Sequence, residues 1–161
     1  MQIKSKSLIK YSRQYVTEED KEAVMTILNS DFLTQGPAVP QFENTLTNIV
    51  SAKHGIAVNS GSSALHIACL ALGVGSGDRV WTSPNTFVAS ANCGRLCGAD
   101  VDFIDIDGRT GNISVSELEK KLVKAHKDNA LPKVVIPVHF AGQPTKQERI
   151  WNLAQKFGFY V

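Results

Sequence analysis

The sequence predicts an α/β protein with a mostly parallel sheet. Short apolar stretches typical of buried strands alternate with longer stretches whose apolar residues recur at helical spacing. This alternation favours parallel strands joined by helices. Ligands of such sheets gather at the carboxyl ends of the strands. The loops expected there are 59–63, 83–87, 105–107 and 139–143. We expect them to converge in space although they are far apart in the sequence.

The first 55 residues are expected to form an irregular arm and two helices. Residues 1–16 show no regular pattern, and Thr17 then precedes three acids, which indicates a capped helix start. A second helix is expected from about Val39, with Gly55 as its left-handed stop.

From residue 56 onward, strands and helices alternate. The expected strands are 56–58, 79–83, 101–106, 134–140 and one that begins at 159; the expected helices are 64–72, 86–96, 115–124 and 147–157. The segment 73–78 has glycines spaced as in a dinucleotide fingerprint. It follows a helix and precedes a strand, so we interpret it as a connecting turn.

Composition excludes several classes of protein. The chain has 161 residues, 43% of them hydrophobic and 20% charged, with a net charge of +2, so charge predicts neither a nucleic-acid partner nor a membrane partner. Its apolar runs are too short to cross a bilayer, and its first ten residues do not resemble a secretory signal. The chain has three cysteines, and their odd number and their spacing fit neither a disulfide framework nor a metal site. We expect small buried thiols and a cytoplasmic location.

The turn at residues 59–63 is the first candidate site. It joins an apolar stretch to a helix pattern and is rich in hydroxyls. The first amides of a helix have no partner within it and attract anions such as phosphate. The hydroxyls of Ser62 and Ser63 add donors for the same oxygens. The alternative is that Ser60 simply caps the helix.

Three motifs, in this order, resemble the DegT/DnrJ/EryC1/StrS family of sugar aminotransferases. They are Ser60-Gly61-Ser62-Ser63-Ala64-Leu65-His66, Ser83-Pro84-Asn85-Thr86-Phe87-Val88-Ala89-Ser90 and Val138-His139-Phe140-Ala141-Gly142. The segments 11–14 and 32–37 are similar to the branch of the family that acts in pseudaminic acid biosynthesis. The resemblance implies the N-terminal part of the large domain of a fold-type I transferase that uses pyridoxal 5'-phosphate (PLP).

The resemblance also assigns roles to individual residues. Ser62 and Ser63 match the family's binding site for the PLP phosphate, and Phe87 matches the aromatic residue that stacks on the pyridine ring. The alternative for Phe87 is a core residue at a helix start. Leu33, Thr34 and Gly36 resemble a substrate-side segment. The resemblance places His139 near the active-site rim, although an ordinary role at a strand end fits equally well.

The family's two catalytic positions are absent from the sequence. The acid that pairs with the pyridinium nitrogen and the Schiff-base lysine both fall beyond Val161, so no catalytic residue is assigned here. We therefore expect an N-terminal arm with helices over 1–55 and an incomplete PLP-binding domain over 56–161. The chain alone is expected to be inactive.

The resemblance implies a reaction for the full-length protein. An amino group passes, with glutamate as the expected donor, to the 4-keto group of a UDP-linked 6-deoxy sugar within a homodimer. Two alternatives stay open: a related dehydratase in which histidine replaces the lysine, and a non-catalytic, truncated, dimerising remnant.

Overall fold

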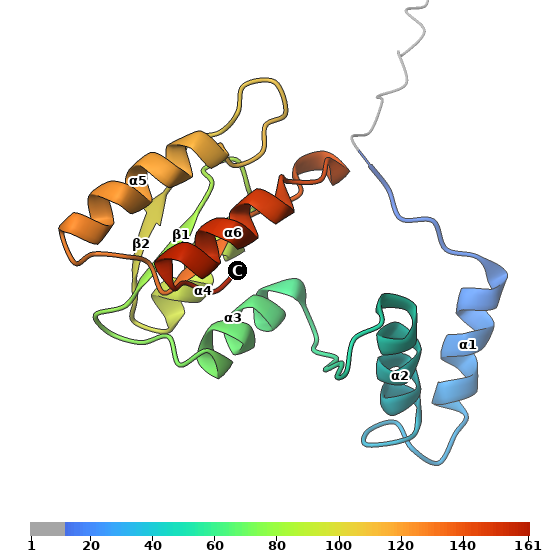
Figure 1. Ribbon diagram of the computed structural model, residues 1–161. Helices are drawn as coiled ribbons and strands as arrows, with labels where there is room; N and C mark the ends of the chain where they lie inside the picture. Colours follow the sequence, from blue (N-terminus) through green and yellow to red (C-terminus); the bar gives the residue numbers. More distant parts are fainter. Residues whose placement is uncertain (1–11) are drawn as a thin grey trace, which may run out of the picture. The chain divides into compact units, whose positions relative to one another are not determined.

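A parallel sheet organises the structure, a computed structural model that describes residues 12–161 (Figure 1). Its three strands are β1 (Arg79–Thr82), β2 (Asp100–Phe103) and β3 (Val134–Ile136), in the order β2-β1-β3. Both pairings are parallel. This confirms the predicted α/β architecture. Most of the arm predicted over 1–16 lies outside the described residues.

Helices cover both faces of the sheet (Figure 1). One face packs against α3 (Gly61–Ala71) and α4 (Ala89–Leu96), and the other against α5 (Val115–Lys127) and α6 (Gln147–Phe157). Successive side chains of a strand point to opposite faces. Accordingly Val80 joins the core on the α3 and α4 side, while its neighbour Trp81 joins the core on the α5 and α6 side.

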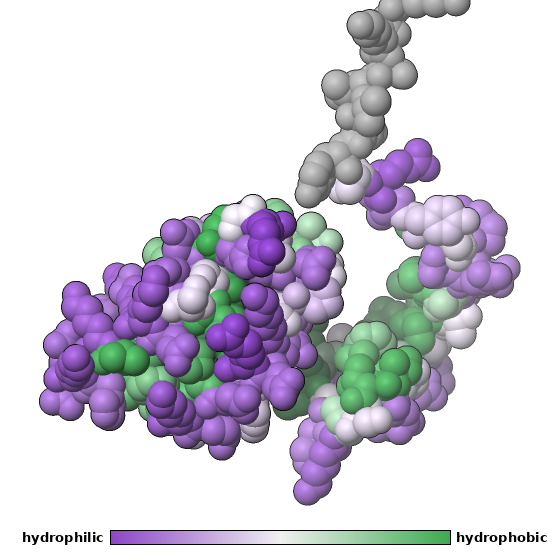
Figure 2. All heavy atoms as spheres, turned by 45° about the horizontal axis from the view of Figure 1, so that its top comes forward, coloured by the Kyte–Doolittle hydropathy of each residue, from purple (hydrophilic) through white to green (hydrophobic). Residues whose placement is uncertain are grey.

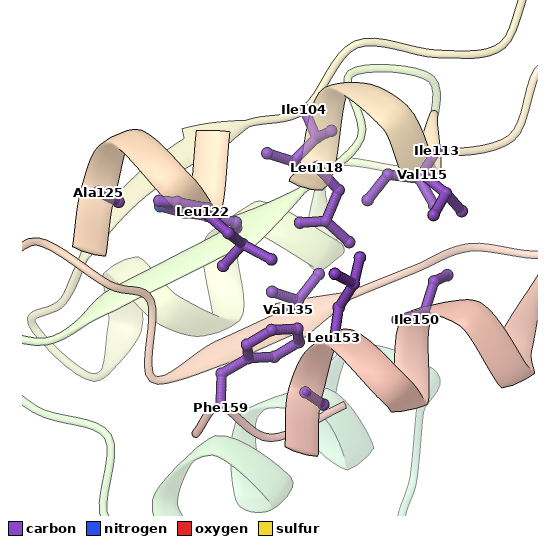
Figure 3. Close-up of a cluster of buried hydrophobic side chains, with 12 residues drawn as sticks. Ile104, Ile113, Val115, Leu118, Leu122, Ala125, Val135, Ile150, Leu153 and Phe159 are labelled. Carbon is purple, nitrogen blue, oxygen red and sulfur yellow. The ribbon is translucent and has the colours of Figure 1, made fainter. Parts of the chain in front are cut away.

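The larger core lies between the sheet and the helices α5 and α6. In Figure 3, Leu118 and Leu122 of α5 gather with Leu153 of α6 around Val135 and Phe159. Burying a leucine side chain of this kind stabilises the fold by about 1.5–3 kcal/mol. The helix α5 owes its place to this apolar stripe.

A lysine fastens α5 to the edge strand β2. Lys121 Nζ donates to Phe103 O over 2.8 Å and lies 2.6 Å from Asp102 Oδ2, and it sits 5.0 Å from the centre of the buried Trp81 ring. The pKa of Asp102 is lowered, because hydrogen bonds from Lys121 and the Phe103 amide outweigh the opposing effect of its partial burial. The strand β2 thus carries two outward-facing acids, Asp100 and Asp102. Each of them lies near a basic side chain.

The chain divides into two compact units between Ala57 and Val58. The first contains α1 (Glu18–Leu28) and α2 (Ala38–Val50), and neither helix buries a single residue. Thr17 caps α1 as predicted, in a reciprocal pair of hydrogen bonds with Asp20. Apolar side chains remain exposed on both helices and appear as green surface in Figure 2; they include Val24, Leu28, Phe42, Leu46 and Ile49. These helices need a partner surface for their apolar side chains.

Two predictions near the junction of the units are wrong. Residues 56–58 form no strand: no segment of the described chain pairs with them, and Ile56 is 76% exposed. An apolar stretch becomes a strand only when a neighbour supplies hydrogen bonds. The left-handed stop of α2 is Ser51, with φ 54°, and Gly55 does not have positive φ.

Three later elements are shorter than predicted. The helix expected from residue 86 begins at Ala89, and the Thr86 hydroxyl lies 2.9 Å from the Ser90 hydroxyl in its first turn. The strand expected over 134–140 ends at Ile136, because Pro137 has no N–H to donate to a sheet. The strand expected over 101–106 ends at Phe103, and Ile106 pairs with Ile113 instead.

None of the helices in the described part of the chain has the length and apolar character to traverse a bilayer. Within the same residues there is no cluster of three or more histidine, cysteine or acidic side chains suited to a metal ion.

Candidate functional site

The first turn of α3 is closed by its own side chains. Ser60 has extended backbone, with φ −161°, and its Oγ accepts from the Ser63 amide over 3.1 Å. Ser63 Oγ in turn donates to Asn59 Oδ1 over 2.7 Å. The capping role of Ser60, weighed as an alternative from the sequence, is therefore real.

The cap leaves other donors unengaged. Among the described residues, the amides of Gly61 and Ser62 and the Ser62 hydroxyl have no hydrogen-bond partner, and Ser62 is exposed. These donors lie at the positive end of the helix dipole. A Cβ added to Gly61 would meet nothing within 4 Å, so the space beside this amide is open. The two predicted serines therefore differ, because Ser63 is half-buried and already bonded, whereas Ser62 is available.

This helix start faces the carboxyl ends of the strands. Gly73, just beyond the end of α3, accepts from Lys133 Nζ over 2.6 Å, and Lys133 lies just before β3. The helix therefore runs antiparallel to β3. An eleven-residue helix spans about 16 Å, which carries its first turn toward the ends of the strands.

A buried asparagine, five residues beyond the predicted loop 105–107, is bonded to the predicted loop 139–143. Asn112 is 4% exposed; its Oδ1 accepts from the Phe140 amide over 2.9 Å, and its Nδ2 donates to Gln143 O over 2.9 Å and to Pro144 O over 3.1 Å. These partners lie about thirty residues further along the chain, and the sequence did not single out Asn112. The loop at 107–112 is thereby fixed to the loop at 139–145.

A second asparagine adds the loop that carries Phe87. Asn85 Nδ2 donates to Gly111 O over 3.1 Å. Gly111 has φ +71° and no room for a side chain, because an added Cβ would meet the Phe140 ring at 2.9 Å and Asn85 Nδ2 at 3.1 Å. The predicted loops 83–87 and 139–143 are therefore both bonded to the loop at 107–112, which overlaps the predicted loop 105–107 only at Asp107.

Phe87 lies in the loop between β1 and α4. Its side chain is 74% exposed, so the alternative of a core phenylalanine does not hold in this structure. An exposed flat apolar ring beside clustered loops is suited to stacking on a planar ligand.

His139 is held at both ring nitrogens. Its Nδ1 accepts from the Thr145 amide over 3.1 Å, and its Nε2 lies 3.0 Å from Gln147 Nε2. Since Nδ1 is an acceptor, a neutral ring carries its proton on Nε2, and a flip of the Gln147 amide that exchanges its nitrogen and oxygen would let the oxygen accept from that N–H. The imidazole links the end of β3 to the start of α6, which has no side-chain cap of its own.

The predicted substrate-side residues lie in the first unit, between α1 and α2. Leu33 and Thr34 are exposed, and Gly36 is half-buried. A Cβ added to Gly36 would lie 2.6 Å from Phe32 Cβ, so the loop requires glycine there.

The three thiols belong to the core between the sheet and the helices α3 and α4. Cys69 and Cys93 are buried, and Cys97 is half-buried at the end of α4. Burial, followed by the neighbouring Cys93, raises the pKa of Cys69 to about 12. This supports the prediction of small packed side chains.

Comparisons with known proteins agree on one family. The family model described as the DegT/DnrJ/EryC1/StrS aminotransferase family matches residues 14–161. The UDP-4-amino-4,6-dideoxy-N-acetyl-beta-L-altrosamine transaminase of Campylobacter jejuni is 39% identical over 150 residues, which are 93% of this chain and 39% of that protein.

Solved structures show the same relationship. PseC of Helicobacter pylori, an aminotransferase involved in the biosynthesis of pseudoaminic acid, matches with a TM-score of 0.84 and 32% identity over 94% of this chain and 40% of that one. The PLP-form of the putative sugar aminotransferase Spr1654 from Streptococcus pneumoniae matches with a TM-score of 0.82 and 27% identity, over 95% and 38% of the two chains. The chain thus spans about two fifths of the length of these relatives.

Proposed function

This chain belongs to the DegT/DnrJ/EryC1/StrS aminotransferase family, and from that premise we propose that the first turn of α3 binds the phosphate of PLP. The unpartnered amides of Gly61 and Ser62 carry this proposal, together with the exposed Ser62 hydroxyl. Ser63 contributes by holding the turn in shape through Asn59 and Ser60. Phe87 is proposed to form one wall of the slot for the pyridine ring.

The residues present fit the cofactor. A phosphate dianion needs several donors and a positive field, and an uncrowded helix start supplies both. A phenylalanine offers the ring apolar area without a competing polar group. When bound, PLP acts as an electron sink for amine chemistry. The part played by this chain is to anchor the phosphate, orient the ring and keep water from its Phe87 face.

For the full-length protein we propose transfer of an amino group, from glutamate, to the 4-keto group of a UDP-linked 6-deoxy sugar in pseudaminic acid biosynthesis. The names of the Campylobacter jejuni and Helicobacter pylori relatives support this substrate class. Leu33, Thr34 and Gly36 are proposed to lie on the substrate side. We further propose that the full-length protein is a cytoplasmic homodimer and that this chain is inactive by itself.

The test uses pyridoxine 5'-phosphate, which has the phosphate and ring of PLP but no aldehyde to react with surface lysines. We expect the chain to bind it in equilibrium dialysis and to bind pyridoxine, which lacks the phosphate, more weakly. Ser62→Asp places a negative charge beside the phosphate, so we expect binding to weaken by about tenfold or more.

A matched control separates charge repulsion from loss of structure. Ser116 is also exposed and is also the second residue of a helix, α5. An aspartate in the first turn stabilises a helix through its dipole. Both variants should therefore keep the circular dichroism spectrum of the unchanged chain. Ser116→Asp should bind as the unchanged chain does. Equal binding by the two variants, or binding that does not depend on the phosphate, contradicts the proposal.

A further inference from the structure

We propose that Asn85 is a positioning residue, which holds the loop of Phe87 in the shape that lets its ring stack on the cofactor. This inference rests on the proposed function in one respect, since it takes Phe87 as one wall of the slot for the pyridine ring. Such a wall is most useful when it is ordered before the ligand arrives, because a loop that becomes ordered on binding lowers the affinity. Phe87 therefore needs an anchor.

The Phe87 ring does not anchor itself. Its side chain is 74% exposed, and neither of the two buried hydrophobic clusters includes it. The next residue, Val88, is also exposed. Packing therefore contributes little to the order of this loop, and hydrogen bonds have to supply it.

On the side of α4, these hydrogen bonds are local. The Thr86 hydroxyl lies 2.9 Å from the Ser90 hydroxyl, and the Ser90 amide donates to Phe87 O over 3.1 Å. Ser90 is buried at the start of α4. These bonds attach Phe87 to the first turn of that helix, but they do not join the loop to a distant segment.

Asn85 supplies the link to a distant segment. Its Nδ2 donates to Gly111 O over 3.1 Å, across 26 residues of sequence. Within residues 12–161, no other hydrogen bond joins residues 83–88 to a segment beyond α4. Without this bond the loop would be attached only to β1 and α4.

The acceptor of this bond is itself held in place. The Gly111 amide donates to Asp107 O over 2.8 Å, and the next residue, Asn112, is bonded to residues 140–144. Gly111 has φ +71°, so its carbonyl direction is set by a conformation that residues with a side chain rarely adopt. Asn85 therefore binds to a well-fixed point of the site.

The first test uses the chain without any ligand. In ¹⁵N relaxation measurements we expect the Phe87 amide to have an order parameter of about 0.85, and we expect Asn85→Ala to lower it below about 0.6. Asn152→Ala removes the same kind of side chain at an exposed position of α6 and should leave the value unchanged. Gly111→Ala would place a Cβ 3.1 Å from Asn85 Nδ2 and should lower the value as well.

The second test measures binding of pyridoxine 5'-phosphate. The net contribution of one hydrogen bond corresponds to about fivefold in an equilibrium constant, so Asn85→Ala should weaken binding by about fivefold. In the Phe87→Leu background the same substitution should weaken binding no further, because Asn85 acts through Phe87. Inorganic phosphate needs no ring wall and should bind Asn85→Ala as it binds the unchanged chain.

Three results would overturn the proposal: an unchanged Phe87 order parameter in the folded Asn85→Ala chain, an equal loss of affinity in the Phe87→Leu background, or an equal loss for inorganic phosphate. Circular dichroism checks folding, and if Asn85→Ala does not fold, the order parameter in Gly111→Ala decides. Failure of the unchanged chain to bind pyridoxine 5'-phosphate would instead refute the proposed phosphate site. The order parameter needs no ligand, so it still decides whether Asn85 positions Phe87.

Discussion

Replacing Asn112 by alanine should destabilise the fold by breaking the link between two loops at the candidate site. The side chain is buried and makes one hydrogen bond through its oxygen and two through its nitrogen. All three partners are backbone groups of residues 140–144. No other residue in the loop at 107–112 could take over these contacts without moving the backbone.

The magnitude follows from counting the bonds. A hydrogen bond of this kind contributes about 1 kcal/mol net, so losing three costs about 3 kcal/mol. Phe140, Gln143 and Pro144 are exposed, and water can reach the backbone groups that Asn112 leaves behind. We therefore expect a loss of about 2–3 kcal/mol in the free energy of unfolding.

Urea unfolding followed by circular dichroism measures the global effect, and hydrogen exchange of the Phe140 amide measures the local one. That amide donates to Asn112 Oδ1, so its exchange should accelerate in the variant. Asn152→Ala, at an exposed position of α6, is the control and should change stability by less than about 0.5 kcal/mol. Unchanged Phe140 protection, or a loss no larger than that of the control, would refute the reasoning.

Two further predictions concern a thiol and a glycine. Iodoacetamide at pH 8 should label Cys97 well before Cys69, because burial raises the pKa of Cys69 to about 12. The thiol of the unfolded chain ionises from about pH 8.5, so the contribution of Cys69 to stability is complete below that pH and is lost as the pH rises toward 12. In alkaline unfolding, the free energy of unfolding of Cys69→Ala should therefore depend less steeply on pH than that of the unchanged chain. Gly111→Ala should lower the free energy of unfolding by about 1–3 kcal/mol, because an alanine there must adopt a positive φ and approach the Phe140 ring to 2.9 Å. Gly108→Ala, in the same loop, should cost little, since nothing lies within 4 Å of an added Cβ. Equal unfolding midpoints for the two variants would contradict this reasoning.

Local signals in the sequence located most helices well. The helix over 147–157 has the predicted limits, and the caps at Thr17 and Ser60 are where hydroxyls precede apolar periodicity. Such features depend on residues three or four positions apart, which a single sequence displays directly.

Long-range features were harder to predict. The partners of Asn112 lie about thirty residues away, and no pattern in the residues around Asn112 pointed to them. Residues 56–58 have the apolar character of a strand, but strand formation depends on a neighbour that the segment itself cannot specify. The difference between Ser62 and Ser63 likewise emerged only from the hydrogen bonds to Asn59 and Ser60.

The acids on β2 have a consequence for how the protein assembles. Asp100 and Asp102 place negative charge along one border of the sheet, where a stray strand from another molecule would have to approach and shed their hydration. Hydrated charges along this border should therefore discourage edge-to-edge aggregation of the protein.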